Sequence, residues 1–102
     1  MKYFVCYTTR DKEVNLDLLQ SFSNELKKIG DVFIDMIDND SVDKQSRVLS
    51  ELDSSDVLVL IETSNIYKSE WVTIELNRAK EKGIPIRTVK PFEIEKYLIN
   101  DK

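Results

Sequence analysis

Apolar residues in this chain form short continuous runs separated by stretches in which they recur at helical spacing. The runs at residues 3–8, 31–35, 56–61 and 84–89 are rich in aromatic and β-branched residues, which favours strands. Residues 57–61 are five consecutive aliphatic residues, and this pattern predicts a central strand that is buried on both faces. Pro85 places the last strand at an edge of the sheet or marks its start.

The stretches between these runs are predicted to be helices. The first extends from about residue 11 to 29, with Asp11 as its cap and Gly30 as its stop. A polar loop at residues 38–41 precedes a second helix, and a third covers residues 70–82 and ends at Gly83. A last helix opens at Pro91. The positions expected to be buried are Val48, Leu49 and Leu52 in the second helix; Val72, Leu76 and Ala79 in the third; and Ile94, Tyr97 and Leu98 in the last.

Strands that alternate with helices at short intervals imply right-handed βαβ units and a parallel sheet. We therefore expect a single α/β domain over residues 1–102, a flavodoxin-like three-layer sandwich with a parallel four-stranded sheet in the order 2-1-3-4. Ligands of such folds bind beyond the carboxyl ends of the strands, where the strand order reverses. This rule places the candidate site around residues 8–11 and 62–71.

Composition excludes several kinds of chemistry. The chain has no histidine and a single cysteine, so it cannot form a Ser-His-Asp triad, a Cys-His pair or a zinc site built from these ligands. Its two glycines do not form a phosphate-binding loop, and the acidic cluster at residues 38–43 does not have calcium-loop spacing. We therefore expect no metal and no cofactor.

Charge and cysteine content bound the partners and the compartment. A net charge of −4, with lysine and arginine spread along the chain, argues against nucleic acid and anionic lipid as partners. No apolar run approaches the roughly 20 residues that cross a bilayer. One cysteine fits a reducing compartment, so we expect a cytoplasmic protein.

Three segments together resemble the Toll/interleukin-1 receptor (TIR) domain family. Residues 3–11, YFVCYTTRD, are similar to the first TIR box, with Cys6 in place of the usual serine. Residues 32–35, VFID, resemble the second strand of the family. Residues 69–76, SEWVTIEL, match the Ser-x-Trp-x-x-x-Glu-Leu helix that follows a hydrophobic strand, and this is the most specific of the three. The resemblance covers about residues 3–89.

The resemblance implies an activity and a site. Enzymatic TIR domains cleave NAD, as a substrate, at the nicotinamide–ribose bond with the glutamate after the tryptophan, which is Glu75 in this chain. Trp71, one helical turn earlier, could wall the pocket over that carboxylate. The remaining substrate-binding candidates lie at the end of the first strand: Thr8, Thr9, Arg10 and Asp11. Arg10 is the candidate for a substrate phosphate.

Other interpretations of the same residues remain open. Glu75 could simply pair with Arg78 on a solvated helix edge, which would make Glu75→Gln nearly neutral for stability. The domain could be a non-catalytic TIR-like interaction module, or an enzyme of the nucleoside deoxyribosyltransferase type, which also uses a glutamate at the ribose. The family further implies stress or defence signalling and self-association or a TIR-like partner. Since such sites are built across neighbouring copies, we expect little activity from the monomer.

Overall fold

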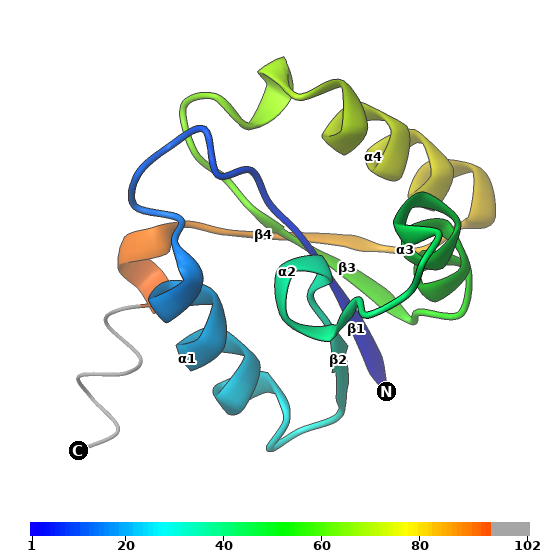
Figure 1. Cartoon of the computed structure of the whole chain (residues 1–102), viewed down its shortest axis with the longest axis horizontal. Coiled ribbons are helices and arrows are strands. Elements are labelled where there is room, and N and C mark those ends of the chain that lie inside the picture. The colour runs from blue at the N-terminus through cyan, green and yellow to red at the C-terminus, as the bar shows by residue number, and fades with distance from the viewer. Residues whose placement is uncertain (95–102) are drawn as a thin grey trace.

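The four strands form one parallel sheet. This computed structural model describes residues 1–94. The strands are β1 (Lys2–Cys6), β2 (Asp31–Phe33), β3 (Val57–Ile61) and β4 (Ile86–Val89). They pair in the order β2-β1-β3-β4, every neighbouring pair is parallel, and β4 is an edge strand (Figure 1). The predicted fold class and strand order are confirmed.

Helices cover both faces of this sheet. They are α1 (Leu16–Leu26), α2 (Asp35–Asp38), α3 (Lys44–Asp53), the 3-10 turn η1 (Ile66–Lys68) and α4 (Glu70–Lys82). Figure 1 shows α1 on one side of the strands and α3 and α4 on the other. Because β3 has helices on both sides, all five of its residues are buried, as its aliphatic sequence predicts.

Alternation along the strands divides the core into two halves. Phe4 and Cys6 of β1 pack with Leu58 and Leu60 of β3 against α3 and α4. Val5 and Ile61 point to the other face and pack against α1. Successive side chains along a strand therefore face opposite layers of helices. In β1, Phe4 and Cys6 face α3 and α4, and Val5 faces α1.

A local signal marks each end of α4, and the sequence prediction used only the one at Gly83. The hydroxyl of Ser69 accepts a hydrogen bond from Val72 N at 3.3 Å and caps the first turn. Gly83 ends the helix with a φ of 71°, a left-handed conformation that suits glycine. The predicted bounds of this helix, residues 70–82, are confirmed.

The first helix and the segment after β2 differ from the prediction. Asn15, not Asp11, caps α1, because its side-chain oxygen accepts a hydrogen bond from Leu18 N at 3.0 Å. The unpredicted α2 forms directly after β2, where the Asp38 carboxylate accepts a hydrogen bond from Ile34 N at 2.8 Å and closes the turn. The predicted strand residue Asp35 is therefore the first residue of a helix.

The predicted C-terminal helix falls only in part within the described residues. Residues 91–94 are helical, and Ile94 is buried against the α1 layer. The other positions predicted for its apolar side, Tyr97 and Leu98, lie outside the described residues. Within residues 1–94 no helix has both the length and the apolar character needed to cross a membrane.

Candidate active site

A small cleft lies where β1 and β2 end and α4 begins. Its volume is about 180 Å³. It is lined by Phe4, Val5, Tyr7, Thr8, Thr9, Asp35, Trp71 and Glu75. This is the edge of the sheet where ligands of doubly wound folds bind. The cleft contains four of the residues that the sequence predicted for the site: Thr8, Thr9, Trp71 and Glu75.

Packing of α4 places Glu75 in this cleft. Val72 and Ala79 belong to the core, and Glu75 lies between them at helical spacing, so it shares their side of the helix. Its side chain is only 6% exposed. The structure contradicts a pairing of Glu75 with Arg78 on a solvated edge, because Arg78 donates two hydrogen bonds of 2.6 Å to the Asp53 carboxylate. The predicted buried residue Leu76 is only partly buried.

Burial changes the ionisation of Glu75. Removal from water raises the pKa of its carboxyl from 4.5 to about 7, the Cys6 thiol beside it acts as a hydrogen-bond donor and lowers the pKa, and the nearby charge of Asp35 raises it. The carboxyl is therefore close to half ionised at neutral pH. A group with a pKa near the operating pH is suited to proton transfer or to switching between neutral and charged forms.

The side chains on β1 beside Glu75 remain protonated. Burial, together with the charge and hydrogen bond of Glu75, raises the pKa of the Cys6 thiol well above its ordinary value. Cys6 is fully buried and is not a thiolate nucleophile. Burial also raises the pKa of Tyr7 to about 12, and the Tyr7 hydroxyl accepts a hydrogen bond of 3.0 Å from Met36 N of α2. Tyr7 thus presents a neutral phenol at the cleft.

Asp35 is a second carboxylate in the cleft that sequence reasoning did not assign to the site. It is half-buried, and its Oδ1 accepts a hydrogen bond of 2.6 Å from Asn39 Nδ2. A signal was available, since Asp35 follows the strand that neighbours β1 in the predicted order, and parallel strands end at the same edge. The sequence did not predict α2, which begins at Asp35 and places its carboxylate near Glu75.

The threonines and the tryptophan line the cleft in different ways. Thr8 is buried, and its hydroxyl accepts a hydrogen bond of 3.3 Å from Arg10 N, whereas Thr9 is exposed. Trp71 is half-buried: it packs against the core of the α3 and α4 layer and also lines the cleft. The indole therefore serves both packing and the site.

Arg10 and Asp11 are not among the residues that line the cleft. The Arg10 side chain is exposed. Asp11 accepts hydrogen bonds from Asn65 N at 3.0 Å and Asn65 Nδ2 at 2.7 Å, so it ties the loop after β1 to the loop after β3. The Thr63 hydroxyl, which faces Asp11 without meeting full hydrogen-bond geometry, and these two donors lower the pKa of Asp11.

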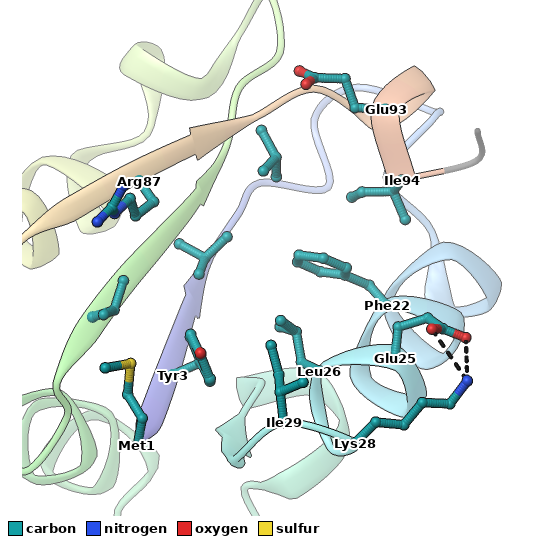
Figure 2. Close-up of a pocket in the computed structure, with 13 residues that line it drawn as sticks. Met1, Tyr3, Phe22, Glu25, Leu26, Lys28, Ile29, Arg87, Glu93 and Ile94 are labelled. Atoms are coloured by element: carbon teal, nitrogen blue, oxygen red, sulfur yellow. Dashed lines mark hydrogen bonds and ion pairs between the residues drawn. The ribbon is translucent and has the colours of Figure 1, made fainter. Parts of the chain in front are cut away.

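A larger cavity of about 580 Å³ lies on the α1 side of the sheet (Figure 2), and Glu75 is not among its lining residues. Its walls are mainly apolar side chains, such as Tyr3, Phe22 and Val89, and of its two acidic residues, Glu25 and Glu93, Glu25 is paired with Lys28. The smaller cleft is the better candidate for catalysis because it holds the reactive groups.

Comparison with protein-family models gives no match to this chain, and comparison with curated proteins gives none either.

Proposed function

We propose that this chain cleaves NAD at the nicotinamide–ribose bond, with Glu75 as the catalytic residue. The observation that carries the proposal is a buried carboxyl with a pKa of about 7 that lines a cleft at the carboxyl ends of parallel strands, one helical turn from an indole. The TIR-like motif at residues 69–76 supports the same assignment.

The reaction suits a site without histidine. The bond between the anomeric carbon and the pyridinium nitrogen breaks, and both electrons go to nitrogen, so nicotinamide leaves as a neutral molecule without a general acid. The ribosyl group becomes cationic, and the ionised Glu75 carboxylate stabilises it or bonds to it briefly. Water then adds its oxygen to the anomeric carbon and releases one proton, which gives ADP-ribose. A ribosyl hydroxyl in place of water would give a cyclic product.

The surroundings of Glu75 are consistent with that role. Burial destabilises the charged form of the carboxylate, and a cationic ribosyl group beside it would relieve this instability. Asp35 would add a second negative charge near the same cation. The Cys6 thiol, a donor to the carboxylate, would hold its orientation without neutralising its charge.

Nicotinamide release tests the proposal. Concentrated wild-type protein should release nicotinamide from NAD, and Glu75→Gln should lower the rate by about 100-fold or more, because it removes charge that acts mainly in the transition state. Asp40→Asn is a matched control, since Asp40 is 95% exposed and does not line the cleft. It should keep wild-type activity.

The alternatives predict different results. Equal release by the wild type and Glu75→Gln would assign Glu75 to structure. Absence of release at every protein concentration would favour the interaction module. Base exchange on deoxynucleosides, lost in Glu75→Gln, would identify a deoxyribosyltransferase-type enzyme.

A further inference from the structure

The charged residues that line the cleft are all acidic. Its lining residues include two carboxylates, Asp35 and Glu75, and none of its described lining residues is lysine or arginine. Arg78, the arginine nearest in sequence to Glu75, forms an ion pair with Asp53. Arg10 is exposed and does not line the cleft. A phosphate inside this cleft would face two acids without a charged donor, which disfavours anions.

The size of the cleft limits what enters it. Its volume is about 180 Å³, whereas sites that enclose a drug-sized ligand have volumes from about 300 Å³. A dinucleotide with two phosphates and a purine exceeds that space. One heteroaromatic ring and the sugar carbon to which it is bonded are a closer match.

From charge and size together we infer that the cleft is selective for a single cationic heteroaromatic ring joined to ribose, that Asp35 sets this charge preference, and that the phosphates of a dinucleotide remain outside. The identity of the ring, a nicotinamide-type pyridinium, rests on the proposed function. The preference for positive charge rests on the residues of the cleft alone.

Three groups would recognise such a ring. Trp71 offers an indole, the aromatic side chain that attracts cations most strongly. Glu75 supplies a carboxylate with few other partners, and the Cys6 thiol is its donor. The Asp35 carboxylate, at the first residue of α2, accepts a hydrogen bond of 2.6 Å from Asn39 Nδ2, which holds it in place at the cleft.

Trp71 allows a binding test that does not require catalysis. It is the only tryptophan in the chain, so intrinsic tryptophan fluorescence reports on this cleft. The probes are nicotinamide methylated on its ring nitrogen, which is cationic and has no glycosidic bond, and unmodified nicotinamide, which is neutral. The cation should quench saturably, with an affinity at least about tenfold higher than that of the neutral ring.

Asp35→Asn identifies the source of the preference. Asparagine keeps an oxygen that can accept from Asn39 and removes only the charge. This variant should bind the cationic probe about tenfold more weakly and the neutral probe as before, whereas Asp40→Asn should match the wild type. Equal affinities of the wild type for the two probes, or quenching by the cation that rises linearly without saturation, would overturn the inference.

Turnover tests the statement about phosphates. Nicotinamide riboside lacks both phosphates of NAD, and its kcat/KM should lie within about threefold of the value for NAD. Cleavage of NAD at least about tenfold more efficiently than the riboside would refute exclusion of the phosphates and leave the proposed function intact. Failure to cleave either substrate would refute the proposed function, and the probe titrations would still decide the charge preference.

Discussion

Glu75→Gln should stabilise the fold at alkaline pH, and the gain should disappear in acid. Glu75 is 6% exposed, and burial raises its pKa from 4.5 to about 7. Between these values the unfolded chain has already released the proton that the folded protein retains, so ionisation favours unfolding. The contribution of Glu75 to the stability of the wild type is therefore greatest below about pH 4.5, falls as the pH rises to about 7, and is level above that.

The size of the effect follows from the two pKa values. Each pKa unit corresponds to about 1.4 kcal/mol. The pKa of Glu75 is shifted from 4.5 to about 7. Between pH 5 and pH 8 this shift lowers the free energy of unfolding of the wild type by about 2.5 kcal/mol relative to a variant that cannot ionise at position 75. For a chain of this size the corresponding difference in thermal midpoint is about 10–20 °C.

Urea and thermal unfolding of the wild type and Glu75→Gln at pH 5 and pH 8 measure this change. Other carboxylates titrate in both proteins, so the difference between the two proteins isolates Glu75. Glu81→Gln removes a carboxylate from the exposed side of the same helix and should follow the wild type. A stability difference between wild type and Glu75→Gln that is the same at both pH values would refute the argument from burial.

Three further outcomes follow from the site and the fold. NAD cleavage should rise with pH to a plateau above about pH 7, because the ionised form of Glu75 is the active one, and a flat profile of nicotinamide release from pH 5 to pH 9 would contradict this. Turnover per molecule should increase with protein concentration if neighbouring copies complete the site; concentration-independent turnover by a strictly monomeric sample would show that one copy suffices. Gly83→Ala should lower the free energy of unfolding by about 1 kcal/mol, because Gly83 has a φ of 71° and a Cβ there meets no atom within 4 Å, so backbone strain is the only cost. Lys82→Ala is its control in the same unfolding assay, and an equal loss in both variants would contradict that reason.

The sequence by itself determined the elements whose signals are local. Five aliphatic residues at 57–61 predicted a strand buried on both faces, and the structure buries all five. Gly83 predicted the end of α4 as a helix stop, and the predicted start at residue 70 is confirmed, where the structure shows Ser69 as the cap. Right-handed crossovers then left few ways to order the strands, and the observed order is the simplest of them.

The tertiary structure alone decided which charges meet. Spacing on the helix allowed Glu75 to pair with Arg78, but α3 brings Asp53 to Arg78, and Glu75 turns inward to Cys6. Nothing within α4 specifies either partner, because both come from residues far away in the chain.

Asp35 shows the same limit at the site. Its position after β2 was visible in the sequence, yet its approach to Glu75 depends on the unpredicted turn of α2 and on the pairing of β2 with β1. Periodicity and capping act over a few residues, so a sequence can place each element. The pKa of Glu75 depends on solvent exclusion, on the Cys6 thiol of β1 and on the charge of Asp35 in α2, and only the packed fold brings these together.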